Sequence, residues 1–306
     1  MSDAIQKDII IIGAGPAGMT AAIYGQRAGK STLMIEAKAY GGKIINTPDI
    51  ENYPGFEHIS GFEYAQKLYN QATALGAELV YATATGIEKL DEHRFIVHTT
   101  SGDFEGRAVI VATGAKSRAL GLAREADLIG RGISYCATCD GMFFRKKDVA
   151  VQGGGDTAFE DAAFLANYCN KVYIIHRRDA FTADEVHVAK LRDRDNVEFI
   201  LNTAVTDLIG EERLEAVELT DKVTGEKRTL PVSGLFVAIG QAPDNAAFDN
   251  VLSLDEKGYV VASEECLTGT DGVYVAGDCR KKKVHQLTTA AADGAVSALA
   301  AVSGMK

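Results

Sequence analysis

Two cysteines three residues apart, Cys136 and Cys139, are followed directly by an acid, Asp140. A Cys-x-x-Cys at the start of a helix lowers the pKa of one thiol, and the thiolate is the reactive form. The spacing also brings both sulfurs within disulfide reach on one helical turn, so the pair can cycle between dithiol and disulfide. Asp140 is a candidate acid or base that protonates a departing thiolate; the alternative is a helix N-terminal acid that interacts with the dipole.

A zinc site and a structurally inert pair are the other interpretations. A structural zinc site needs four ligands, yet Cys169, Cys266 and Cys279 form no second Cys-x-x-Cys, and no Cys/His cluster has metal-ligand spacing. Five cysteines are an odd count in 306 residues, which argues against a secreted disulfide framework. We therefore favour a redox pair and expect no metal.

The composition narrows the possible partners and the compartment. With 42 acidic and 32 basic residues the formal net charge is −10, which argues against a nucleic-acid partner because phosphate contacts need a basic surface. The start of the sequence, MSDAIQKDIIIIG, lacks the features of a signal peptide, and the apolar run 9–12 is too short to span a bilayer. We expect a cytoplasmic protein with no membrane partner.

Residues 7–36 predict a dinucleotide-binding unit. A buried strand (9–12) is followed by a glycine turn, an Ala-rich helix and a second strand (31–36) that ends in Glu36. Gly13 permits the tight turn, Gly15 lets a pyrophosphate approach the backbone, and Gly18 lets the helix pack closely on the strand. The phosphates then lie at the positive N-terminus of the helix, and Glu36 accepts hydrogen bonds from a ribose.

Residues 146–179 repeat the pattern of strand, glycine turn, helix and strand. Gly153, Gly155 and Ala158 take the three fingerprint positions, and the sequence 176–178, His-Arg-Arg, stands where the first copy has its acid. An acid suits a free ribose 2′-hydroxyl, whereas arginines suit a 2′-phosphate through charge-assisted bonds. The first site is therefore expected to bind an ADP moiety without that phosphate, and the second to bind NADP.

The rest of the chain fits two such α/β units, the second inserted into the first. Strand and glycine patterns at 107–114 and 233–240 follow hairpin-like stretches at 93–106 and 214–227, and residues 256–262 carry another hairpin signal. A buried strand ending in Gly277 and Asp278 is followed by an Ala-rich helix at 288–301. We predict two Rossmann-like, three-layer domains: an FAD-binding domain of residues 1–116 and 247–306, and an NAD(P)H-binding domain of residues 117–246 that carries the cysteines.

Several motifs resemble those of low-molecular-weight thioredoxin reductases in order and approximate spacing, nearly end to end. They are IIIIGAGPAGMTAAIY, GGKIINTPDIENYPG, VATGA, SYCATCDGMFF, GGGDTAFEDA, IIHRRD, FVAIGQAPDN and GVYVAGDC. The resemblance implies FAD and NADPH as cofactors, thioredoxin or a thioredoxin-like protein as partner, and a homodimer. By the same resemblance Cys139 lies next to the flavin, Cys136 attacks the partner and Asp140 is the acid.

The resemblance also implies the binding positions. Those for FAD are Gly13, Ala14, Gly15, Pro16, Ala17, Gly18, Glu36, Gly42, Lys43, Asn52, Thr113, Gly277, Asp278, Gln286 and Leu287. Those for NADP are Gly153, Gly155, Asp156, Thr157, Ala158, His176, Arg177 and Arg178. Asp278, at a strand end before a helix, suits the ribityl hydroxyls; the alternative is a helix N-cap.

Three positions depart from the family pattern. Thr182 replaces the third arginine of H-R-R-x-x-x-R, His285 replaces the arginine of an Arg-Gln pair, and Lys43 replaces the glutamine of Gly-Gly-Gln. A missing cationic contact weakens the preference for NADPH, so a reductase of the same fold that uses NADH or ferredoxin, or another thioredoxin-like partner, is the alternative.

A redox-inert flavoprotein is the rival from another class, but it has no need of the cysteine pair. Because the nicotinamide and the cysteines belong to one inserted domain and each must reach the flavin, they are expected to alternate by rotation about the linkers.

Overall fold

The structure, a computed structural model, describes residues 5–47 and 49–305. The chain divides into two compact units. Unit 1 comprises Met1–Pro48, Tyr53–Lys116 and Ala242–Lys306, and unit 2 comprises Asp49–Asn52 and Ser117–Gln241. Residues 242–246 thus group with unit 1, where Asn245 is buried and its amide donates to the carbonyls of Gly258 and Cys279.

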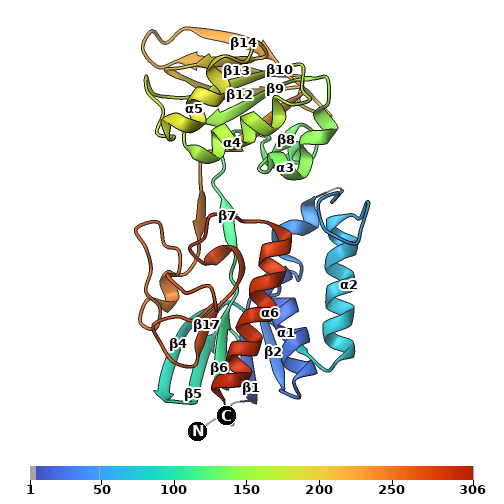
Figure 1. The fold of residues 1–306 in the computed structure, drawn as a ribbon, viewed down its shortest axis with the longest axis vertical. Coiled ribbons are helices and arrows are strands. Elements are labelled where there is room, and N and C mark those ends of the chain that lie inside the picture. The colour runs from blue at the N-terminus through green and yellow to red at the C-terminus, as the bar shows by residue number, and fades with distance from the viewer. Residues whose placement is uncertain (1–4, 48, 306) are drawn as a thin grey trace. The chain divides into compact units, whose positions relative to one another are not determined.

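Unit 1 is built on a sheet of seven strands with the order β3-β2-β1-β6-β5-β4, to which β17 adds by pairing with β6 (Figure 1). The strands are β1 (Ile5–Ile12), β2 (Thr32–Glu36), β3 (Glu78–Tyr81), β4 (Ala84–Asp91), β5 (Arg94–Thr99), β6 (Gly102–Val111) and β17 (Val273–Val275). The helices are α1 (Pro16–Arg27), α2 (Gly61–Ala74) and α6 (Leu287–Gly304), with the short 3-10 helices η1 (Gly42–Asn46), η4 (Ala246–Phe248) and η5 (Gly277–Cys279).

Two apolar layers enclose the parallel part of this sheet, which explains the unbroken run of isoleucines in β1. Ile9 and Ile11 pack in one core with residues of α1 and α6. Ile10 and Ile12 pack in a second core with residues of β4, β5 and the segment 248–260. The predicted strand, helix and second strand at residues 9–36 are confirmed by β1, α1 and β2.

Unit 2 contains a parallel sheet of order β11-β10-β9-β15-β8 and an antiparallel sheet of order β12-β13-β14 (Figure 1). Its strands are β8 (Ile133–Ser134), β9 (Asp148–Gly153), β10 (Lys171–Ile175), β11 (Val197–Ile200), β12 (Thr203–Ile209), β13 (Ala216–Asp221), β14 (Lys227–Pro231) and β15 (Gly234–Ala238). Its helices are α3 (Ala137–Asp140), α4 (Asp156–Leu165) and α5 (Glu185–Arg192), with η2 (Ala126–Leu128) and η3 (Gly141–Phe144).

The parallel sheet of unit 2 packs against helices on one face and against the antiparallel sheet on the other. One core joins Val149 and Val151 of β9 to residues of α4 and α5. The other joins Ala150 to residues of the antiparallel sheet, among them Leu208 and Val217. This is a second three-layer α/β unit, as the repeated pattern predicts.

Two strands carry the chain between the units, and they pair with each other: β7 (Ala115–Ser117) and β16 (Gln241–Pro243). The hairpin-like stretches predicted at 93–106 and 214–227 are confirmed by the antiparallel pairs β5–β6 and β13–β14. The signal at 256–262 gives no named strand, only isolated bridges of Val260 with Leu254 and Arg280.

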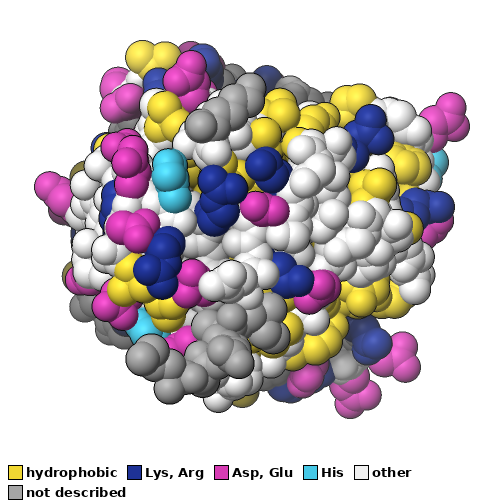
Figure 2. Space-filling model, turned by 90° about the horizontal axis from the view of Figure 1, so that it is seen from below, with side chains coloured by type: hydrophobic (Ala, Val, Ile, Leu, Met, Phe, Trp, Pro, Cys, Tyr) yellow, Lys and Arg dark blue, Asp and Glu magenta, His cyan; other side chains and the backbone are white. Residues whose placement is uncertain are grey.

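The exterior carries charges of both signs. On the face shown in Figure 2, acidic and basic side chains lie interspersed among apolar and neutral ones. Among the described residues, no helix has both the length and the apolar character needed to cross a membrane.

Candidate active site

The three glycines after β1 differ in what surrounds them. A Cβ on Gly13, whose φ is +109°, would lie 2.3 Å from the carbonyl oxygen of Ala112, and a Cβ on Gly18 would lie 1.9 Å from that of Gly13. A Cβ on Gly15 would meet nothing closer than 4.0 Å. Gly13 and Gly18 are therefore required by packing, whereas the space over Gly15, which caps α1 at Pro16, is open to a phosphate.

The other expected FAD positions gather at the carboxyl ends of the parallel strands of unit 1. Glu36 ends β2, and its Oε2 accepts from the Ala14 amide at 2.9 Å. Thr113 follows β6 and donates its hydroxyl to Asn245 at 2.7 Å. A carboxylate has about four lone-pair sites, so Glu36 retains capacity for a ribose. Parallel α/β sheets bind ligands at this edge.

Asp278 carries the feature of unit 1 that best suits a polar ligand. Its Oδ2 lies 2.8 Å from Nζ of Lys43, and its Oδ1 is buried without a hydrogen-bond partner among the described residues. Buried polar atoms in native proteins are hydrogen-bonded, so Oδ1 fits a ribityl hydroxyl. Gln286, the N-cap of α6, forms a capping box with Thr289, and Leu287 is the first residue of the helix.

A buried ion cluster fastens the turn that carries Asp278. Oδ2 of Asp293 accepts from the Gly277 amide at 3.1 Å, and its two oxygens also bind Arg280 and Lys282 at 3.0 and 2.8 Å. These three side chains are less than one tenth exposed. These buried contacts hold η5 in place. No motif in the sequence indicated the cluster.

The second glycine turn, after β9, repeats the arrangement with one difference. A Cβ on Gly153 would lie 2.4 Å from the carbonyl oxygen of Ala238 and 2.7 Å from Cβ of Ala158, whereas one on Gly155 would meet nothing closer than 3.7 Å. A Cβ on Gly154 would lie 2.1 Å from Nδ1 of His176. The imidazole is thus buried beneath the turn, and burial lowers its pKa, assisted by nearby arginine charges.

Arg177 and Arg178 lie exposed on the loop that follows β10. Thr182 donates from its amide and its hydroxyl to the carbonyl of Gly154, at 2.7 and 3.0 Å. Asp156 and Thr157 are exposed at the start of α4, and Asp156 accepts from the Asp184 amide at 2.8 Å. Thr182, which stands where the family pattern has an arginine, is therefore hydrogen-bonded to the glycine turn.

Cys136 and Cys139 form a disulfide at the start of α3, where Cys136 is the N-cap. The Ser134 hydroxyl lies next to the pair: it donates to Oδ2 of Asp140 at 2.6 Å and accepts from the Cys136 amide at 3.1 Å. Burial raises the pKa of Asp140, and the hydrogen bond from Ser134 opposes that rise. Its Oδ1 is buried without a partner among the described residues. Asp140 is thus held close to a redox-active pair and biased toward its protonated form.

Two further acids support this segment and were not indicated by the sequence motifs. Glu125 is buried and accepts from the amides of Leu120 and Gly121 at 2.8 Å and from the Tyr135 hydroxyl at 2.7 Å. Asp161 on α4 accepts a hydrogen bond from the Ala137 amide, and burial raises its pKa to about 7. Asp161 acts on a segment distant in sequence, which a short-range pattern cannot reveal, whereas the partners of Glu125 are near in sequence but belong to no recognised motif.

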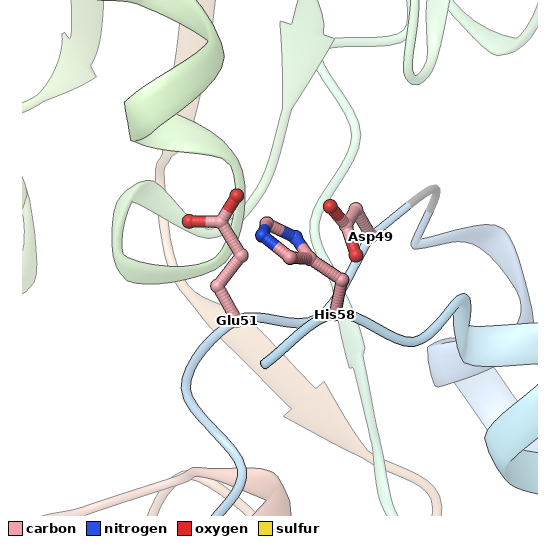
Figure 3. A group of neighbouring side chains, drawn as sticks. All are labelled: Asp49, Glu51 and His58. Atoms are coloured by element: carbon pink, nitrogen blue, oxygen red, sulfur yellow. The ribbon is translucent and has the colours of Figure 1, made fainter. Parts of the chain in front are cut away.

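Asn52 and the acidic residues just before it group with unit 2, not with the unit that holds the other expected FAD positions. The Asn52 amide lies 3.4 Å from the carbonyl of Thr138, which stands between the two cysteines. Asp49 and Glu51 flank the ring of His58, with ligand atoms within 4.8 Å of one another (Figure 3). Glu51 and His58 are exposed, and such groups are common without an ion, so no metal is assigned.

Comparison with known proteins identifies the family. The model of the pyridine nucleotide-disulphide oxidoreductases matches residues 7–294. A curated thioredoxin reductase from Bacillus subtilis (strain 168) is 42% identical over 97% of this chain and 94% of its own length. One from Treponema pallidum (strain Nichols) is 41% identical over 97% and 96%. The crystal structure of thioredoxin reductase from Streptococcus pyogenes MGAS5005 superposes with a TM-score of 0.93 at 37% identity, covering 99% of each chain. The chain therefore belongs to the thioredoxin reductases within the pyridine nucleotide-disulphide oxidoreductase family.

Proposed function

We propose that this protein reduces the disulfide of thioredoxin with electrons from NADPH, through FAD and the pair Cys136 and Cys139. The family uses FAD and NADPH. The observation that carries the proposal is the disulfide between Cys136 and Cys139 at the start of α3. It lies beside Asp140, whose pKa is raised by burial, and it belongs to the same unit as the second glycine turn. Thioredoxin as partner is supported by a Mycobacterium leprae relative named bifunctional thioredoxin reductase/thioredoxin, 40% identical over 95% of this chain.

In this proposal unit 1 binds FAD and unit 2 binds NADPH. The open space over Gly15 and the free Oδ1 of Asp278 support the first assignment. The open space over Gly155 and the exposed Arg177 and Arg178 support the second, because guanidinium groups recognise a 2′-phosphate. His176 holds the turn from below.

The residues of the pair then act in thiol–disulfide exchange. FAD, when bound, passes the electrons of NADPH to the disulfide. The thiolate of Cys136 attacks one sulfur of the partner disulfide and forms a mixed disulfide, which the thiolate of Cys139 resolves, so the partner leaves as a dithiol. Asp140 gives its proton to a departing thiolate, and its raised pKa favours the protonated acid that this step needs.

A same-fold enzyme with a different electron donor is the second candidate. The specific observation in its favour is Thr182, whose hydroxyl is engaged by the Gly154 carbonyl and cannot supply the charge of an arginine. Stopped-flow reduction of the flavin by NADPH and by NADH, followed by transfer to thioredoxin, tests the two. Faster reduction by NADPH with turnover of thioredoxin supports the proposal. Equal and slow reduction of the flavin by both nucleotides overturns the NADPH assignment. The disulfide chemistry is then tested separately by the rate of electron transfer to thioredoxin.

We also propose a cytoplasmic location, a homodimer and alternation of the units about β7 and β16. The three free cysteines, all buried, fit a reducing compartment. The homodimer and the alternation are supported by the family resemblance. Sedimentation of the purified protein and turnover after cross-linking of the two units test them, with full turnover of the cross-linked form counting against alternation.

A further inference from the structure

Of the departures from the family pattern, Lys43 is ion-paired with Asp278, and His285 lies close enough to feel the charge of the same carboxylate. Nζ of Lys43, in η1, is 2.8 Å from Oδ2 of Asp278, whose side chain is 12% exposed while that of Lys43 is 54% exposed. His285 precedes α6, stacks on Tyr259 with ring centroids 5.7 Å apart, and has a buried Nε2 without a partner among the described residues. The three side chains belong to unit 1 and come from separate segments of it.

A buried carboxylate requires a compensating charge, and the structure shows which residue provides it. Burial lowers the pKa of His285, an effect that the positive charges of Lys282 and Lys43 reinforce and that Asp278 opposes. The ring is therefore neutral at pH 7 and does not balance Asp278. Lys282 and Arg280 are the other nearby cations, and both bind Asp293. Lys43 is left as the countercharge.

The two carboxylate oxygens of Asp278 have different surroundings and therefore different roles. Oδ2 is held by Lys43, and Oδ1 faces a buried position without a partner. An ion pair to one oxygen fixes the orientation of the carboxylate, so the other oxygen is presented in a set direction. The neutral ring of His285 adds a second hydrogen-bonding atom without adding charge.

We propose that Lys43 is a positioning residue for FAD, which holds Asp278 so that Oδ1 receives the flavin's ribityl chain and which balances the charge of that carboxylate in place of a cation at position 285. This deepens the proposed function, since it rests on FAD occupying unit 1. Relative to the family pattern, the positive charge stands at position 43 instead of position 285, and the net charge around Asp278 is retained.

The proposal predicts coupling between positions 43 and 285. Lys43→Gln leaves Asp278 buried without a countercharge, so FAD is expected to dissociate about tenfold faster. The flavin midpoint potential is expected to fall, because an unbalanced negative charge disfavours the addition of electrons. Lys43→Arg keeps the charge and is expected to stay close to the unmodified protein. The double variant Lys43→Gln/His285→Arg returns the cation to position 285 and is expected to recover both properties.

The experiment uses the purified holoenzyme and two readouts that do not depend on turnover. Release of FAD is followed by its fluorescence after dilution, and the midpoint potential is measured by reductive titration against a reference dye. Lys67→Gln is the control, since Lys67 is an exposed lysine in an ion pair with Glu63 at 3.4 Å, and it is expected to change neither readout.

Unchanged release and potential in Lys43→Gln would overturn the proposal, as would a double variant that is no better than Lys43→Gln. Reduction of thioredoxin by the unmodified protein is measured alongside. This measurement tests the proposed function independently of the role of Lys43.

Discussion

Removing one hydroxyl, with Ser134→Ala, tests whether Asp140 acts as the acid in thiol–disulfide exchange. The Ser134 hydroxyl donates to Oδ2 of Asp140 at 2.6 Å and lowers the pKa that burial raises. A hydrogen bond to a charged group contributes about 1.5–3 kcal/mol, and one pKa unit corresponds to about 1.4 kcal/mol. Because Asp140 is partly exposed and water replaces part of the lost bond, we expect the ionised form to lose about 1.4 kcal/mol of stabilisation, which raises the pKa of Asp140 further.

The sign of the effect on rate follows from the role of the acid. A proton donor works only while protonated, so the exchange rate falls as the pH rises through the pKa of Asp140. Ser134→Ala raises that pKa and therefore moves the falling limb of the pH–rate profile upward by about one pH unit. The rising limb, which reports formation of the attacking thiolate, is expected to move less.

The assay is a single turnover of pre-reduced enzyme with oxidised thioredoxin across a range of pH. Asp140→Asn is the matched variant: the amide donates no proton, so the falling limb should vanish and the rate should drop by about 100-fold, while reduction of the flavin by NADPH persists. A falling limb that stays in place or moves down in Ser134→Ala, or one that survives in Asp140→Asn, would show that another group supplies the proton.

Three further changes test other parts of the site. Cys139→Ser should abolish reduction of thioredoxin and leave the bound flavin spectrum intact; normal turnover would remove Cys139 from the reaction. Arg177→Ala should weaken binding of NADPH by about tenfold with little effect on NADH, whereas Thr182→Arg should strengthen the preference for NADPH, both measured by stopped-flow flavin reduction. Equal effects on the two nucleotides would argue against recognition of the 2′-phosphate. Gly15→Ala should fold normally but bind FAD more weakly, because a Cβ there points into open space, whereas Gly18→Ala should lower the melting temperature, because its Cβ would lie 1.9 Å from a carbonyl oxygen. Equal stability of the two glycine variants would contradict the packing role of Gly18.

Local patterns were enough to predict much of the fold. The order of strand, glycine turn, helix and strand predicts β1, α1 and β2, and its repeat predicts β9, α4 and β10, because the periodicity and the turn residues are local properties. The hairpin signal at 256–262 gave only isolated bridges. There the tight turn at residues 255–259 is present, yet the flanking residues pack into a core of unit 1 instead of extending as a ladder.

The sequence by itself supplied the groups for the chemistry: a cysteine pair followed by an acid, and two glycine turns, one expected to suit a free ribose hydroxyl and the other a 2′-phosphate. These depend on residue type and spacing over a few positions, which the chain fixes before it folds. Tertiary structure decided the partners of those groups. The His176 ring beneath Gly154 and the Lys43 ammonium on Asp278 are contacts between segments that only packing brings together. Ser134 is only six residues from Asp140, but its hydrogen bond depends on how that short segment folds. Burial and pairing control protonation and orientation, and both arise from the folded environment instead of from any single stretch of sequence.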